Sequence, residues 1–68
     1  MILQVNHHGS WANVNEFDPA LLKVVQERTI VAALRASARV TWRIVDRRSK
    51  SPKVLFRMDG PVFSWRKA

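Results

Sequence analysis

The segment Arg39 to Asp46, which reads RVTWRIVD, decides the fold of this chain, together with KVLFRM at 53–58. Apolar and polar side chains alternate in both runs, which is the pattern of a strand with one face on a core and one in water. A third alternating run, VFSWR at 62–66, follows the turn-forming sequence Asp59-Gly60-Pro61. We therefore predict three antiparallel strands in the C-terminal half.

A helix is expected before these strands, from Ala20 to about Ser37, because no glycine or proline interrupts this stretch. Asp18 is suited to cap its first N–H groups, and Pro19 fits the first helical position. Phe17, just before the cap, is placed to pack against Leu22 as a hydrophobic staple.

The expected helix carries apolar residues on two sides. One stripe at helical spacing contains Leu21, Leu22, Val25, Ala32 and Ala36. Ile30 and Leu34 point nearly the opposite way. Three explanations are open. The helix kinks near residues 27–29, its second side is a modestly apolar surface exposed to water, or a second copy covers that side, which would make the protein a homodimer through Ile30 and Leu34.

The N-terminal segment adds strand signals of its own. Residues 1–5 are rich in Ile, Leu and Val, residues 7–10 form a turn-like break, and 11–14 suit a weaker returning strand. We expect one α+β domain over residues 1–68, in which the three C-terminal strands and an N-terminal strand or hairpin form a small antiparallel sheet packed on one α-helix.

Composition narrows the classes of protein. The chain has 68 residues and no cysteine, so disulfides and thiolate metal sites are excluded, and we expect no cofactor. No apolar run approaches the roughly 20 residues that span a bilayer, and the first residues lack the basic and apolar regions of a signal peptide. A cytoplasmic protein is the expectation.

The positive charge is concentrated in the second half. Residues 1–38 hold three basic and three acidic side chains, whereas residues 39–68 hold nine basic and two acidic ones, which accounts for the net charge of +7. Such an asymmetry indicates a directed field that attracts nucleic acid, an acidic protein or anionic lipid.

The strand period divides these residues between two faces of the sheet. The face expected beneath the helix holds Val40, Trp42, Ile44, Val54, Phe56, Met58, Phe63 and Trp65. The other face holds Arg39, Thr41, Arg43, Lys53, Leu55, Arg57, Ser64 and Arg66. With the basic loop from Arg47 to Lys53, the predicted partner-binding residues are Arg39, Arg43, Arg47, Arg48, Lys50, Lys53, Arg57 and Arg66.

Two classes of partner fit this basic surface. The first hypothesis is nucleic acid bound without sequence specificity, because arginines neutralise phosphates and contact them through two donors. The alternative is a small modulator or inhibitor, of the kind that phages make, docking on an acidic surface of a larger host protein. A third hypothesis is that the basic face is simply solvated and binds no partner. The aromatic residues of the strands are expected on the opposite, core-facing side of the sheet.

Catalysis is not expected, because no Ser-His-Asp or Cys-His set and no glycine-rich phosphate loop can be assembled. Residues 3–10 resemble the strand-plus-HHGS segment of some metallo-β-lactamase-fold hydrolases, in which His7-His8 would imply a metal-bound histidine. The similarity covers eight residues, and 68 residues are too few for that fold. Because no Cys, Asp or Glu lies within a ligand spacing of the pair, we expect no metal site.

Overall fold

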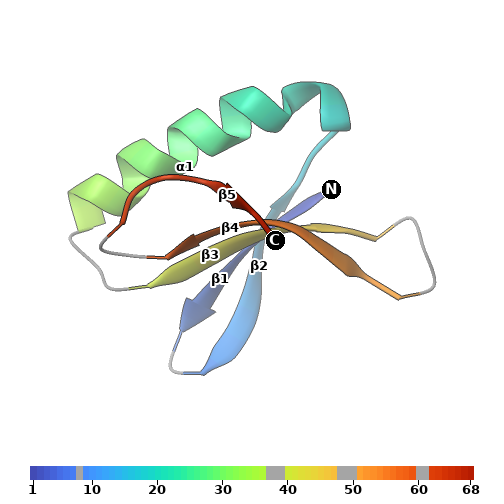
Figure 1. The fold of residues 1–68 in the computed structure, drawn as a ribbon, viewed down its shortest axis with the longest axis horizontal. Helices are drawn as coiled ribbons and strands as arrows, with labels where there is room; N and C mark the ends of the chain where they lie inside the picture. The colour runs from blue at the N-terminus through green and yellow to red at the C-terminus, as the bar shows by residue number, and fades with distance from the viewer. Residues whose placement is uncertain (8, 37–39, 48–50, 60–61) are drawn as a thin grey trace.

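The computed structural model describes residues 1–7, 9–36, 40–47, 51–59 and 62–68, without the side chains of His7 and Ala36. These residues form two layers, a five-stranded antiparallel sheet and one helix lying across one of its faces (Figure 1). The elements in chain order are β1 (Ile2–His7), β2 (Ser10–Glu16), a short 3-10 helix η1 (Pro19–Leu21), α1 (Leu22–Ala36), β3 (Thr41–Asp46), β4 (Lys53–Asp59) and β5 (Arg66–Lys67). The predicted α+β class is confirmed.

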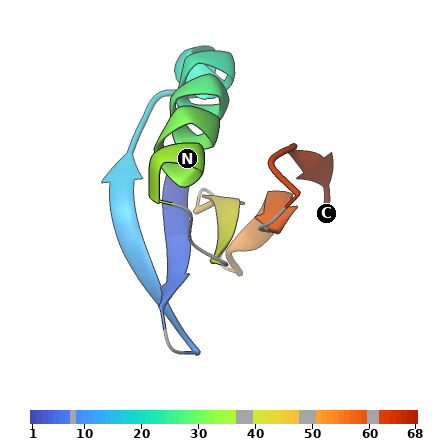
Figure 2. The ribbon, with the colours of Figure 1, turned by 90° about the vertical axis from the view of Figure 1, so that its left-hand side faces the viewer.

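The order of strands across the sheet is β2-β1-β3-β4-β5. Figure 2 looks along the sheet from one side, with the helix above it and β2 at one edge. β1 pairs antiparallel with both β2 and β3, so that the N-terminal hairpin and the C-terminal strands form one sheet. None of the described helices is long and apolar enough to cross a membrane.

The N-terminal hairpin forms and is longer than predicted. Its second strand runs from Ser10 to Glu16, where the sequence indicated only residues 11–14. Gly9 at its tip has a φ of 85°, a conformation that glycine adopts without strain, and its N–H donates to Asn6 Oδ1 at 3.0 Å. A local turn signal thus closes the hairpin and fixes its register.

The predicted cap of the helix is confirmed. The Asp18 carboxylate accepts a hydrogen bond from the Ala20 N–H at 2.8 Å, and Pro19 opens η1. Phe17 is buried beside the cap, and Leu22 packs against the cluster that contains it, as expected for a staple. The end predicted near Ser37 is one residue beyond Ala36, and Ser37 lies outside the described residues.

The face that α1 turns to the sheet differs from the predicted stripe. Thr29 and Ala33 are buried and Leu22, Val25 and Ile30 are half-buried, whereas the predicted core residues Leu21 and Ala32 are exposed. Because apolar residues lie on more than one side of this helix, their spacing along the sequence was not enough to identify the buried side. The Thr29 hydroxyl is satisfied by donating to the carbonyl of Val25 at 2.7 Å.

The core lies between α1 and the sheet. Leu3, Phe17 and Ile44 form its buried cluster, and half-buried side chains that pack against it include Trp42, Phe56 and Trp65. Met58 is also fully buried. The predicted core face is thus confirmed for its central members. Val45, which alternation placed outside, is buried on the face that carries Arg43, beside its register partner Ile2, which is buried as well.

The third C-terminal strand was predicted to span residues 62–66, and this was wrong, because the observed strand is shorter and begins later. Only Arg66 and Lys67 form β5, while Val62 to Trp65 have no strand pairing. The Trp65 indole N–H donates to the carbonyl of Gln26 in α1 at 3.0 Å, so this segment is held to the helix. Val62 N–H donates to the carbonyl of Asp59 at 2.8 Å, and the expected turn residues Gly60 and Pro61 lie outside the described residues.

Replacing Ile44 by alanine tests the centre of the core. Ile44 is 0% exposed, so Ile44→Ala should reduce the free energy of unfolding by about 2–5 kcal/mol. Leu34→Ala is the control, because Leu34 is 53% exposed and should change stability by less than about 0.5 kcal/mol. Urea denaturation followed by circular dichroism measures both, and equal effects would contradict this core.

Candidate nucleic-acid interface

Three arginines lie side by side on the face of the sheet opposite α1. Arg43 in β3 is the direct register partner of Arg57 in β4, and Arg57 is the direct partner of Arg66 in β5. Direct partners on antiparallel strands point to the same side, with Cα atoms about 4.5–5.5 Å apart. We call these three residues the arginine row.

One carboxylate is hydrogen-bonded to two members of the row. Asp59 Oδ2 accepts from Arg66 Nη2 at 2.9 Å, and Asp59 Oδ1 accepts from Arg57 Nη2 at 3.3 Å. The Arg57 side chain is still 52% exposed and the Arg66 side chain 65% exposed. Such exposed pairs are weak in water, so Asp59 offsets the repulsion within the row without masking its charge.

The pKa of Asp59 reflects these neighbours. Burial by itself raises the pKa, but hydrogen bonds with Thr41, Arg66 and Arg57 and the charge of Arg57 lower it by more, so the pKa lies below its ordinary value. Asp59 is therefore an anion at neutral pH. Thr41 faces Asp59 across the β3–β4 ladder, which explains why it contributes.

Arg43 is held in place by a chain of polar side chains that continues across the other strands. Its Nε donates to Gln4 Oε1 at 2.7 Å, and Gln4 Nε2 donates to Asn13 Oδ1 at 2.8 Å. The guanidinium carbon lies 3.9 Å from the centroid of the Trp11 ring, a cation–π distance. These contacts leave Arg43 a fixed, stacked cation rather than a mobile one.

Arg43 also responds to its surroundings. Partial burial and then the positive charge of Arg57 lower the pKa of Arg43 from its ordinary value. A guanidinium remains protonated at neutral pH despite such a shift. The lowered pKa of Arg43 therefore reflects its partial burial first and the neighbouring charge of Arg57 second.

The predicted basic surface is brought together only in part. Arg43, Arg57 and Arg66 form the row, whereas Lys53 begins β4 opposite Asp46, three residues along β3 from Arg43. Arg47 is exposed just after β3. Arg39, Arg48 and Lys50 lie outside the described residues.

Two further residues belong to this face. Trp11, the one aromatic that the sequence did not assign to the core side, is half-buried on the basic side, and Gln4, which was missed in the sequence, links Arg43 to the hairpin. The signal for Gln4 was its position between Leu3 and Val5, where a polar residue breaks an apolar run. The place of Trp11 depends on its register opposite Asn6, which alternation alone does not set.

Within the described ranges, no three residues among His, Cys, Asp and Glu lie close enough to hold a metal ion. Of the His7-His8 pair, His8 and the His7 side chain lie outside those ranges. No protein-family model, curated protein or solved structure shows a significant match to this chain.

The lowered pKa of Asp59 makes a prediction about stability and pH. An acid whose pKa is lower in the folded state stabilises the fold above its unfolded pKa, about 3.9, and loses that contribution as pH falls through the folded pKa. Asp59→Asn should therefore be less stable than the unchanged protein at pH 7, and the gap should narrow by pH 2.5.

Urea midpoints at the two pH values measure this gap. Glu27→Gln, which removes a negative charge from an exposed site on α1, controls for the general effect of charge in a chain of net charge +7. A gap for Asp59→Asn that stays constant between pH 7 and pH 2.5 would show that the carboxylate does not stabilise the row.

Proposed function

We propose that this protein binds nucleic acid without reading its sequence, through the arginine row. The observation that carries the proposal is the direct adjacency of Arg43, Arg57 and Arg66 on neighbouring strands. Like charges directly opposite in a sheet are destabilising, with such pairs affecting stability by roughly 0.2–1 kcal/mol. The repulsion among the three arginines lowers the stability of the free protein. A bound anion neutralises them and removes this cost, which gives a reason for the arrangement.

The residue type and exposure support phosphate as that anion. A guanidinium offers parallel donors that match two phosphate oxygens, and Arg57 and Arg66 are more than half exposed. The three arginines and Asp59 together carry a net charge of about +2. Phosphates that bind this charge release their counterions, which favours binding. Contacts of this kind hold the backbone and carry no information about the bases.

Trp11 favours a single strand over a duplex. It lies on the same face as the row, stacked with Arg43, and is half-buried. Unpaired bases stack on aromatic rings and on guanidinium planes, and this contact does not depend on sequence. A phosphate track beside one aromatic platform suits single-stranded nucleic acid.

The test is binding of nuclease-treated protein to labelled single-stranded DNA, RNA and duplex DNA across a salt series. Affinity should fall linearly on a log–log plot of binding constant against salt, and single strands should bind more tightly than the duplex. Arg57→Gln should weaken binding to all sequences alike and reduce the salt slope by about one.

Arg35→Gln is the matched control. It removes the same charge from the exposed last turn of α1, in the layer away from the row, and should leave the slope unchanged. Equal losses in the two variants would show that net charge, and not the row, binds the polymer. Absence of binding at low salt would overturn the proposal and direct the search to acidic proteins.

A further inference from the structure

β2 forms an edge of the sheet with one side unpaired by any described strand. Edge strands of natural proteins are commonly protected by lysine, by proline, or by a covering element. The seven residues of β2, SWANVNE, contain neither lysine nor proline. A register shift at Leu3/Gln4 interrupts the β1–β2 ladder, and no described strand pairs with the N–H and C=O groups on the outer side of β2.

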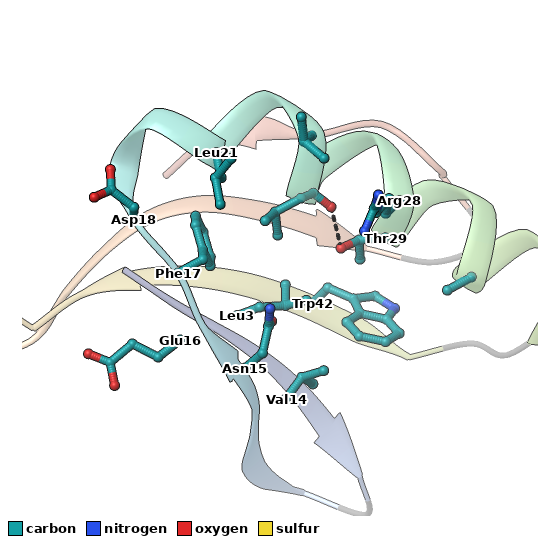
Figure 3. A pocket seen from close by; sticks show the side chains of 13 residues that line it. Leu3, Val14, Asn15, Glu16, Phe17, Asp18, Leu21, Arg28, Thr29 and Trp42 are labelled. Carbon is teal, nitrogen blue, oxygen red and sulfur yellow. Dashed lines mark hydrogen bonds between the residues drawn. The ribbon is translucent and has the colours of Figure 1, made fainter.

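An apolar groove of about 570 Å³ lies between this edge strand and the helix. Figure 3 shows side chains from both walls, with Leu21 on the helical side above Phe17, and Val14 from β2 below Phe17 and Trp42. Val14 and Leu21 are each 50% exposed, and Val24 on the same wall is 43% exposed. Exposed apolar side chains gathered beside an open strand edge are typical of an interface between proteins.

We propose that a second copy of this chain fills the groove and the edge together. The β2 strands of two molecules pair antiparallel about a two-fold axis, and the groove walls pack against each other across it. Such pairing is self-complementary, because a two-fold interface uses the same surface on both copies. This inference is independent of the proposed function.

The distribution of charge favours this side of the molecule for contact between copies. Two chains of net charge +7 repel each other, but the excess lies wholly within residues 39–68. β2 and the helix come from the neutral half, and the charged residues that line the groove are Glu16, Asp18 and Arg28. The two copies thus meet where their mutual repulsion is smallest.

A dimer interface is large relative to this small molecule. A standard interface buries about 800 Å² of each partner, about a sixth of the 4864 Å² of accessible surface here. One side of a molecule whose extents are 34 × 26 × 19 Å is of that order. Pairing would join two five-stranded sheets into one, with both arginine rows on the same outer face.

Sedimentation velocity across about 1–300 μM protein in buffer of high ionic strength, which screens the net charge, tests the proposal. The mass should rise with concentration from 7.9 kDa towards twice that value. Leu21→Glu and Val14→Lys each place a charge in the groove, and each should raise the dissociation constant at least tenfold. Circular dichroism verifies that these half-exposed substitutions leave the fold intact.

Leu34→Glu is the matched control, since Leu34 is 53% exposed on the same helix and does not line the groove. It should dimerise as the unchanged protein does. A mass of 7.9 kDa throughout the range would overturn the proposal. So would a dimer abolished by Leu34→Glu and preserved in Leu21→Glu, which would assign association to the predicted Ile30–Leu34 surface.

Discussion

The pairing of β1 with β3 is the contact on which both faces of the sheet depend. It joins residues about forty positions apart in the chain, with Leu3 opposite Ile44 and Gln4 opposite Arg43. On the helix side this register brings Leu3 and Ile44 into the buried cluster with Phe17. On the other side it lets Gln4 accept the hydrogen bond from Arg43. A one-residue slip would exchange the two faces and remove the core and the ordered cation together.

Local patterns in the sequence were sufficient to predict most of the elements, though not the extent of β2 or of β5. The alternation in residues 39–46 and 53–58, the cap at Asp18 and the turn before Trp11 each have a counterpart in the structure. Each depends on residues within a few positions of one another. Their physical causes, which are strand pleat, orphan helix donors and turn chemistry, operate before any tertiary contact forms.

What the sequence did not predict depends on contacts between distant segments. The two bulges, at Leu3/Gln4 and Ile44/Val45, change which residues oppose one another. Val45 is buried beside Ile2, its partner from the distant strand β1, and local alternation contains no sign of that pairing. The buried side of α1 was mistaken because apolar residues surround that helix, and only its position over the sheet selects Thr29 and Ala33. The arginine row was predicted only in part. The alternation of polar and apolar residues placed its members on one face of the sheet, but the strand order is what makes them adjacent.

The three tryptophans occupy three different environments, and each therefore reports on a different part of the molecule. Trp11 is stacked with Arg43 on the outer face, Trp65 donates to a helix carbonyl, and the buried Trp42 Nε1 has no hydrogen-bond partner among the described groups. Indole emission depends on solvent, nearby charge and hydrogen bonding. Variants that keep one tryptophan at a time would thus give separate optical signals for the sheet surface, the interior and the docking of the C-terminal segment.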